Sequence, residues 1–262
     1  MKLVTLMENT ACRDDLTAEH GLSLYIEAAG RRILFDAGQS DAFIGNAEQL
    51  GVDLSGVDLC ILSHGHYDHG GGLAAFLAVN DHAPVYLSRH AFEPHYNGSS
   101  KYIGLDGELA RSDRLVFTSG DLALGEGLSL HSCRGRSLVA PIVPYGLTML
   151  ENGNLQPEDF RHEQYLLIRE DERRILVSGC SHRGILNIAA WFRPDVLIGG
   201  FHLMKLDPVA DRIKLIAAAS MLSQKDTVYY TGHCTGEAQF AFLKERLGDR
   251  LQALSTGSTF TI

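Results

Sequence analysis

The sequence predicts an α/β fold. Early short runs suggest antiparallel strands: residues 22–27 alternate apolar and polar positions, and residues 32–35 follow as their hairpin partner. Later in the chain, apolar runs at residues 194–198 and 227–231 alternate with stretches of helical periodicity. The sequence contains no linker, low-complexity tract or internal repeat. We therefore expect one domain over residues 1–262.

Hydrophobic periodicity places the other elements in chain order. The expected strands lie at residues 2–6, 57–62, 84–87, 165–169, 174–178 and 259–262, with further short strands in 114–150. The expected helices lie at residues 40–50, 73–79, 185–192, 208–222 and 237–247. In the fourth helix, Ile213, Ile216, Ala217 and Met221 have helical spacing. Residues 88–112 are polar and contain three glycines, which predicts either a lid over an active site or a mobile surface loop.

Composition limits the function classes. The hydrophobic content of 45% and charged content of 21% are typical of a soluble globular protein. A net charge of −9 disfavours a general nucleic-acid binder but permits a local basic pocket for a small anion. Five cysteines, an odd number, do not suggest a disulfide framework. No apolar run reaches the roughly 20 residues of a membrane span, and residues 8–15 are too polar for a signal peptide, so we expect a cytoplasmic protein without membrane contact.

Residues 63–72 read SHGHYDHGGG and follow the apolar run at 57–62. In an extended backbone, His64 and His66 point the same way, because side chains alternate along a strand. Asp68 and His69 are adjacent and can face a second point only if the chain turns there. Imidazole and carboxylate groups are good ligands for zinc, manganese or iron. The motif therefore predicts a metal site at the end of a strand, where α/β proteins place their chemistry.

This His-x-His-x-Asp-His motif after a strand resembles the hallmark of the metallo-β-lactamase superfamily. Further similarities are FDAG at residues 35–38, SGCSH at 178–182 and TGHC at 231–234. Within the superfamily, the chain resembles dihydropterin ribofuranosyl-aminobenzene phosphate synthases. The residues that carry this second resemblance are 19–21, 180–182, 199–202 and 233–236. The superfamily resemblance implies an αββα four-layer sandwich, two sheets packed together with helices outside.

The resemblance also implies ligand roles. His64, His66 and a third histidine would hold one ion, and Asp68, His69 and the late His233 would hold another. His182 is expected to be a further direct ligand, and Cys180 occupies the position of a bridging residue. Residues 160–164 lack the Gly-His turn expected of the third histidine, so His162, Glu163, His182 and His202 remain alternatives, and the number of ions stays open. A thiolate favours zinc, and manganese or iron is also possible.

Other residues have expected roles around these ligands. Asp36 is either a turn-forming residue or a carboxylate that orients the metal-binding loop. Asp68 could accept a proton as well as hold an ion, and His202 could protonate a leaving group. Three residues are weaker candidates for substrate contacts: His20, Lys101 and Tyr102.

The function expected from this site is metal-dependent hydrolysis, or a related lyase or transferase reaction. A metal ion lowers the pKa of bound water towards 7, and the resulting hydroxide would attack a small anionic substrate, a class that includes phosphate-containing molecules. One alternative is a synthase-like role in pterin cofactor synthesis. Others are a non-haem iron redox or sulfur-handling protein and a non-catalytic sensor. The sequence contains no G-x-S-x-G, P-loop or G-x-G-x-x-G motif, and it leaves the substrate and the oligomeric state open.

Overall fold

The computed structural model describes residues 1–262 and contains three β-sheets. The first large sheet has the strand order β18-β1-β2-β3-β4-β5-β8, the second β17-β16-β15-β14-β13-β10-β9, and the small sheet β12-β11-β6-β7. The strands are β1 (Lys2–Met7), β2 (Ser23–Ala28), β3 (Arg31–Phe35), β4 (Leu59–Ile61), β5 (Val85–Ser88), β6 (His95–Asn97), β7 (Lys101–Tyr102), β8 (Leu115–Thr118), β9 (Leu122–Gly125), β10 (Leu128–His131), β11 (Leu147–Glu151), β12 (Asn154–Pro157), β13 (Tyr165–Glu170), β14 (Arg173–Val177), β15 (Val196–Ile198), β16 (Val228–Thr231), β17 (Leu251–Ala253) and β18 (Thr259–Thr261). The α-helices are α1 (Ala42–Gln49), α2 (Tyr67–Gly70), α3 (Leu73–Val79), α4 (Ile185–Phe192), α5 (Arg212–Ser223) and α6 (Glu237–Leu247).

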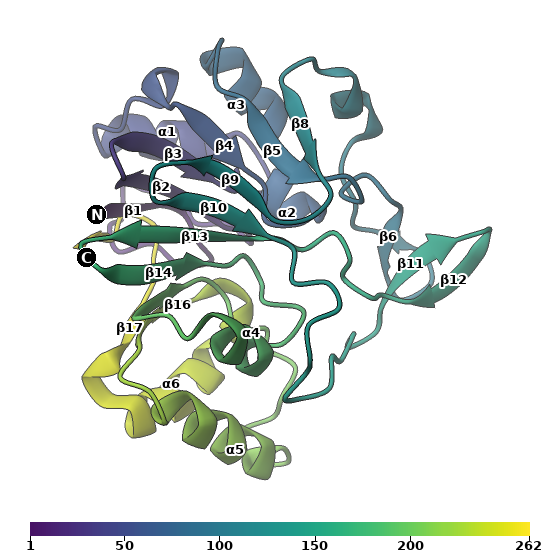
Figure 1. The fold of residues 1–262 in the computed structure, drawn as a ribbon, viewed down its shortest axis with the longest axis vertical. Coiled ribbons are helices and arrows are strands. Elements are labelled where there is room, and N and C mark those ends of the chain that lie inside the picture. The colour runs from purple at the N-terminus through teal and green to yellow at the C-terminus, as the bar shows by residue number, and fades with distance from the viewer.

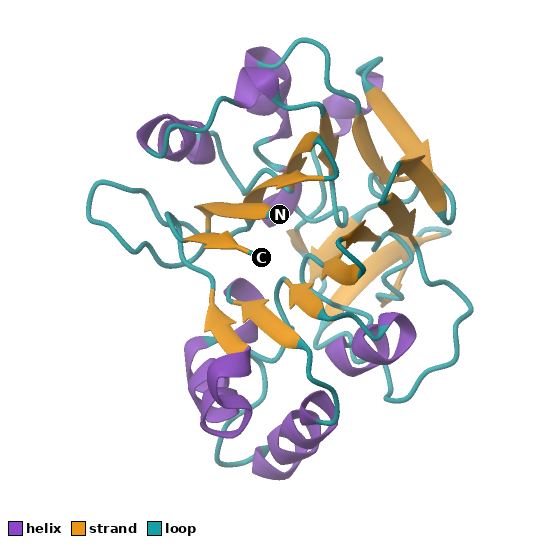
Figure 2. Ribbon diagram, turned by 60° about the vertical axis from the view of Figure 1, so that its left-hand side comes forward, coloured by secondary structure: helices purple, strands orange, loops and turns teal.

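The two large sheets pack face to face, with helices on both outer faces (Figures 1 and 2). Side chains alternate between the layers, as the period of two along a strand requires. On β14, Ile175 and Val177 point into the core between the sheets, while Leu176 packs against the layer that contains α4, α5 and α6. On the other side, α1 and α3 cover the first sheet. The expected αββα sandwich is confirmed.

Parallel strands bring several carboxyl ends to one edge of the sandwich. In the first sheet β3, β4 and β5 run parallel, and in the second β14, β15 and β16 do. The small sheet projects beyond this edge, at the right of Figure 1. Segments that follow strands of both large sheets can therefore meet there.

Most expected elements occur where the sequence places them. The helix at residues 73–79 is confirmed, and the hairpin of residues 165–169 and 174–178 forms as β13 and β14. Four short strands were not expected: β6, β7, β12 and β17. Residues 88–112 are not simply a loop, because they contain β6, β7 and a 3₁₀ turn at Gly107–Arg111.

The helix expected at 208–222 forms as α5, but its named apolar positions do not form the buried face. Ile213 is 83% exposed, and Ile216 and Met221 are also exposed. The buried face is a second apolar stripe: Leu215, Ala218, Ala219 and Leu222. Of the helices, none is both long and apolar enough to cross a membrane. All five cysteines are free, in agreement with the absence of a disulfide framework.

Candidate metal centre

The histidine motif begins where β4 ends. Its backbone bends at His64 and Gly65, is extended at His66 and then turns into the short helix α2. As a result, the rings of His64 and His66 lie 4.6 Å apart between centroids, while Asp68 and His69 turn towards a second point. The glycines after the motif allow close packing: a Cβ on Gly72 would lie 2.2 Å from the Ala37 carbonyl oxygen.

One cluster of possible ligand atoms joins Asp68, His69, Cys180 and His233. His69 Nε2 lies 3.1 Å from Cys180 Sγ and 3.2 Å from His233 Nε2. Asp68 Oδ2 lies 3.3 Å from His233 Nε2 and 3.7 Å from His69 Nε2. These side chains follow β4, β14 and β16, so both large sheets contribute to the cluster.

Hydrogen bonds on the far side of each ring fix which nitrogen carries a lone pair. His69 Nδ1 donates to Asp36 Oδ2 at 2.7 Å, and His233 Nδ1 donates to Asn9 Oδ1 at 2.9 Å. The two Nε2 lone pairs therefore face each other at 3.2 Å. Two nitrogens bound to one tetrahedral zinc at about 2.05 Å would be about 3.3 Å apart. The donor set therefore fits a cation between the two rings.

A second cluster contains His64, His66 and His182. His64 Nδ1 donates to Ser63 Oγ at 2.8 Å, and its buried Nε2 has no protein partner. His66 Nε2 faces Glu158 Oε2 at 3.4 Å, which leaves Nδ1 as the lone-pair donor. Both nitrogens of His182 are buried and unpartnered. Such unpaired buried nitrogens are costly unless an ion or water satisfies them.

The electrostatics keep His64 and His182 of the second cluster neutral. Burial, and then the neighbouring His69 and His66, lower the pKa of His64 well below its ordinary value. Burial, and then His202 and His66, do the same for the pKa of His182. Neutral imidazole is the form that binds metal ions.

In the first cluster, a proton can take the place of a cation. Burial would raise the pKa of Asp68, but the neighbouring His69 and the contacts with His20 and His233 hold it well below its ordinary value. Burial would lower the pKa of His233, yet the hydrogen bond with Asp68 and the negative groups nearby raise it to about 9. Asp68 is thus ionised, and a positive charge beside it is favoured.

Residues 160–164 contact both clusters, and His162 also groups with His66, His95 and Glu158 as a further set of possible ligand atoms. His162 Nδ1 accepts from the Gly65 amide at 2.7 Å, and Gln164 N donates to the Ser63 carbonyl at 2.8 Å. Glu163 Oε1 accepts from the His182 amide at 2.7 Å. The Phe160 ring stacks on the His182 ring at 4.6 Å. Among the alternatives for the third ligand, the geometry therefore favours His182.

Comparison with known proteins agrees with this fold and site. Residues 16–137 match the family model of the metallo-beta-lactamase superfamily. An uncharacterized protein of Methanocaldococcus jannaschii is 31% identical over 245 residues, which cover 88% of this chain and 89% of the relative.

This chain belongs to the metallo-beta-lactamase superfamily.

One further relative and two solved structures cover nearly the whole chain. The 7,8-dihydropterin-6-methyl-4-(beta-D-ribofuranosyl)-aminobenzene-5'-phosphate synthase of the same organism is 29% identical over 282 residues, 94% of this chain and 91% of the relative. The crystal structure of a metal-dependent hydrolase of the beta-lactamase superfamily has a TM-score of 0.82 and 27% identity, over 100% of this chain and 99% of that one. Zinc-bound PqqB from Methylobacterium extorquens, at 14% identity and a TM-score of 0.58 over the full length of both chains, shares the fold.

The expected substrate residues of this superfamily member lie around the clusters. His20 is half-exposed, and its Nε2 lies 3.3 Å from Asp68 Oδ2. Lys101 and Tyr102 lie on β7 beside the metal-binding turn; Lys101 Nζ is 5.8 Å from the ring centroid of Tyr67. None of the three belongs to a set of possible ligand atoms, and their contact with a substrate stays a prediction.

His202, the expected proton carrier, adjoins the second cluster. Its ring centroid lies 4.2 Å from that of His182, and neither of its nitrogens has a protein partner. Both rings line a mainly apolar cavity of about 390 Å³ that also contains Tyr145 and Phe201. His202 further groups with Cys180 and Cys234 as a third set of possible ligand atoms.

Sequence reasoning missed Glu158 and His95. Glu158 is buried, and its Oε1 lies 2.6 Å from His95 Nδ1 and 2.7 Å from His162 Nε2, though without hydrogen-bond alignment. Burial would raise the pKa of this carboxyl, but His162, His66 and His95 hold it well below its ordinary value. A carboxylate behind a ligand histidine fixes the ring and makes it more basic. Glu158 lies 92 residues beyond His66, so no local pattern links the two.

Proposed function

We propose that this protein is a metal-dependent hydrolase that acts on a small anionic molecule. The observation that carries the proposal is the pair of facing Nε2 lone pairs of His69 and His233, 3.2 Å apart. Lone pairs at this distance repel unless a proton or a cation lies between them. Imidazole, carboxylate and thiolate together suit zinc best, although manganese or iron would also be accommodated.

Two ions would be held by two ligand sets that share one turn. His64, His66 and His182 form one set, and Asp68, His69, Cys180 and His233 form the other. When bound, such ions polarise a carbonyl or phosphoryl oxygen and lower the pKa of a coordinated water.

The chain's own groups supply the remaining steps. Asp36, Glu158 and Asn9 hold the histidine rings in orientation. His202 faces the apolar cavity with both nitrogens free, so it would donate a proton to the leaving group. The apolar walls of the same cavity would hold the substrate's body and exclude water.

A metal analysis of the purified protein, combined with a panel of hydrolase substrates, tests the proposal. We expect one or two zinc ions per chain, and turnover of at least one phosphate or carboxylate ester. His233→Ala should lower the metal content and abolish turnover, whereas the exposed His82→Ala should change neither. Full metal content in His233→Ala would refute the ligand assignment.

The second candidate is the synthase reaction, which 29% identity over 94% of the chain to the dihydropterin synthase favours. It uses the same ligand sets, so the metal content would not separate the two functions. Product formation by the synthase assay together with an inactive hydrolase panel would favour it. Iron in place of zinc or manganese would instead support a redox or sulfur-handling role.

A further inference from the structure

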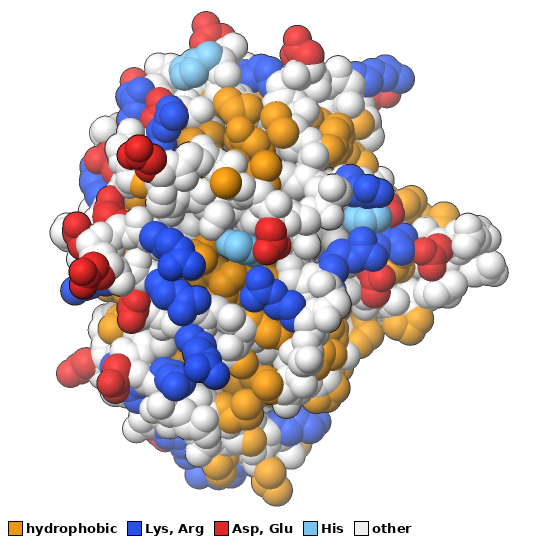
Figure 3. All heavy atoms as spheres, in the orientation of Figure 1, with side chains coloured by type: hydrophobic (Ala, Val, Ile, Leu, Met, Phe, Trp, Pro, Cys, Tyr) orange, Lys and Arg blue, Asp and Glu red, His pale blue; other side chains and the backbone are white.

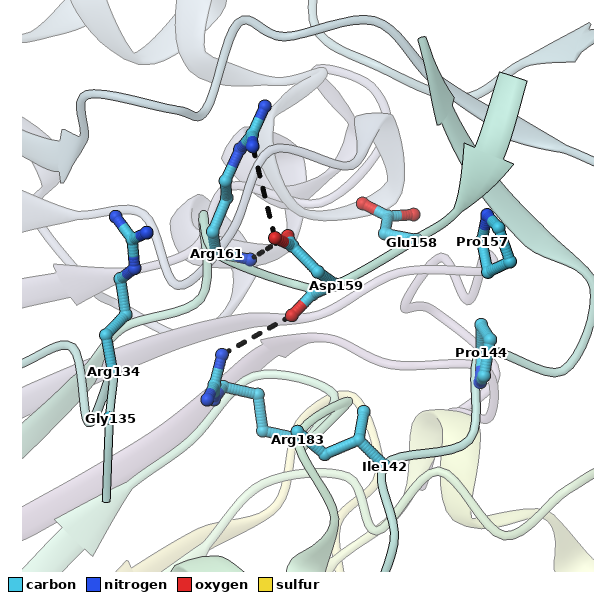
Figure 4. Close-up of a pocket in the computed structure, with 9 residues that line it drawn as sticks. All are labelled: Arg134, Gly135, Ile142, Pro144, Pro157, Glu158, Asp159, Arg161 and Arg183. Atoms are coloured by element: carbon cyan, nitrogen blue, oxygen red, sulfur yellow. Dashed lines mark hydrogen bonds and ion pairs between the residues drawn. The ribbon is translucent and has the colours of Figure 1, made fainter. Parts of the chain in front are cut away.

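A second cavity, of about 490 Å³, adjoins the metal centre (Figure 4). Three arginines from three separate segments line it: Arg134 after β10, Arg161 after β12 and Arg183 after β14. Glu158, which contacts His66, also lines this cavity. The cavity therefore adjoins the candidate metal ligands on one side.

Arg183 is the best-fixed of the three. It is nine-tenths buried and directly follows His182 in the chain. Its amide donates to Glu163 Oε2 at 3.0 Å, and its guanidinium lies 6.0 Å from the Trp191 ring centroid. The guanidinium has no carboxylate within 4.0 Å; Nη1 makes a long bond of 3.4 Å to the Asp159 carbonyl, and the buried Nε has no partner. A buried guanidinium left this way is costly without an anion.

Arg134 and Arg161 are connected through one imidazole and one carboxylate. Arg134 Nη1 donates to His90 Nε2 at 3.2 Å, and His90 Nδ1 donates to Glu93 Oε1 at 2.7 Å. The other oxygen of Glu93 accepts from Arg161 Nε at 2.7 Å, and Glu151 also pairs with Arg161. The charge of Arg161 is therefore offset, whereas no carboxylate lies within 4.0 Å of the Arg134 guanidinium.

The acidic groups of the cavity are turned away from Arg183. In Figure 4, the Asp159 carboxylate faces Arg161, and Asp159 presents only its carbonyl oxygen to Arg183. The Glu158 carboxylate points to the far side, towards the histidines. In Figure 3, Lys and Arg side chains lie across the middle of the face that is drawn, with Asp and Glu side chains among them, although the chain as a whole has a net charge of −9.

We propose that this arginine cavity binds a phosphate group of the substrate. Two guanidinium charges without carboxylate partners, on Arg134 and Arg183, match the double negative charge of a phosphomonoester. Because His182 and Arg183 are adjacent, a phosphate held here directs the rest of the molecule towards the metal ligands. This inference rests on the proposed function and narrows its substrate to a phosphorylated small molecule whose reacting bond lies away from the phosphate.

Isothermal titration of the metal-loaded protein with inorganic phosphate and with phenylphosphonate, a non-hydrolysable analogue of a phosphomonoester, tests the inference. We expect both probes to bind. Arg183→Gln should weaken the binding of both probes about tenfold, because the anion loses a charge-assisted hydrogen bond from the buried guanidinium. Arg134→Gln, at an exposed position that tolerates substitution, should weaken both about threefold. Arg31→Gln, an exposed arginine on the β2–β3 hairpin, is the matched control and should bind both probes like the wild type.

Metal content, measured on every variant, separates this inference from the proposed function. Normal metal content with weakened probe binding in Arg183→Gln and Arg134→Gln supports the arginine cavity. Unchanged binding in both variants would overturn it, because the metal ions alone would then hold the anion, and the proposed hydrolase would stand. Binding of phosphate without phenylphosphonate would also overturn it, since the cavity would not admit a substrate-linked group. If the wild-type protein binds no metal, the proposed function is overturned, but the difference in probe binding between the wild type and the arginine variants still tests the arginine cavity.

Discussion

Asp36→Asn should weaken metal binding at His69 without changing the backbone conformation at position 36. Asp36 is fully buried, at a φ of 59° that asparagine also adopts readily. Its Oδ1 accepts from the Ser63 amide at 2.7 Å, and its Oδ2 accepts from Ser63 Oγ and from His69 Nδ1, both at 2.7 Å. An amide has only one acceptor oxygen, so its NH₂ must face one of these donors.

The consequence for the metal follows from the tautomer of His69. If the NH₂ group faces His69, the ring must accept at Nδ1 and carry its proton on Nε2, the atom that faces His233. If it faces Ser63, the amide of that residue loses its acceptor. Partners of this kind are worth about 10- to 100-fold in metal affinity, or about 1.4 to 2.8 kcal/mol.

Competition with a chromophoric chelator measures this loss for each bound ion. We expect the affinity for the ion held by His69 to fall by that factor, while the thermal unfolding transition remains cooperative. Asp195→Asn is the matched control: this exposed carboxylate accepts from the Arg174 amide at 2.7 Å, at the opposite end of β14. Wild-type metal affinity in Asp36→Asn would refute the reasoning that the carboxylate sets the tautomer.

Other substitutions probe the remaining parts of the site. Asp68→Ala should lower the metal content and abolish turnover; wild-type loading, measured by elemental analysis, would count against its ligand role. His202→Ala should leave the metal content unchanged and lower kcat about 10²- to 10⁴-fold, with the smallest loss for substrates that have good leaving groups; an equal loss for all leaving groups would exclude proton donation. Shortening the exposed tip at residues 98–100 should change KM more than metal loading, and an unchanged KM would argue against a lid. Burial would raise the pKa of Glu93, but the contacts of its carboxylate with Arg161 and a histidine lower that pKa. The ionised carboxylate therefore stabilises the fold at pH values above the pKa of Glu93 in the unfolded chain, and this stabilisation is lost as the pH falls through its pKa in the folded protein. Glu93→Gln should therefore make unfolding less dependent on pH in the acid range, as urea titrations at several pH values would show.

The sequence predicted those parts of the fold that depend on local periodicity. The hairpin of β13 and β14 and the helix α3 have one clear apolar pattern each. Helix α5 has two apolar stripes, and the stripe with the larger side chains, Ile213 and Ile216, faces outward. Periodicity identifies such a helix but cannot say which stripe packs. The edge strand β12 is exposed and polar and ends at a proline, so it lacks any strand signal.

The candidate ligands divide in the same way. His64, His66, Asp68 and His69 lie within six positions, and that spacing alone identified them. The choice between His162 and His182 depended on the Gly65 amide, which occupies one nitrogen of His162. Such a contact joins residues 97 positions apart, and no sequence pattern records it.

Backbone strain at the candidate site indicates that the site forms only when the two large sheets are packed together. Asp36, Ser181, His202 and His233 all have positive φ values, between 49° and 59°, although none is glycine. Residues in this region cost about 1 to 3 kcal/mol each and persist only where the surroundings fix them. Asp36 follows a strand of the first large sheet, and the other three follow strands of the second. The strain at both sheet edges is therefore balanced by contacts that form across them, and bound ions would add to these contacts by joining His69 of one sheet to His233 of the other.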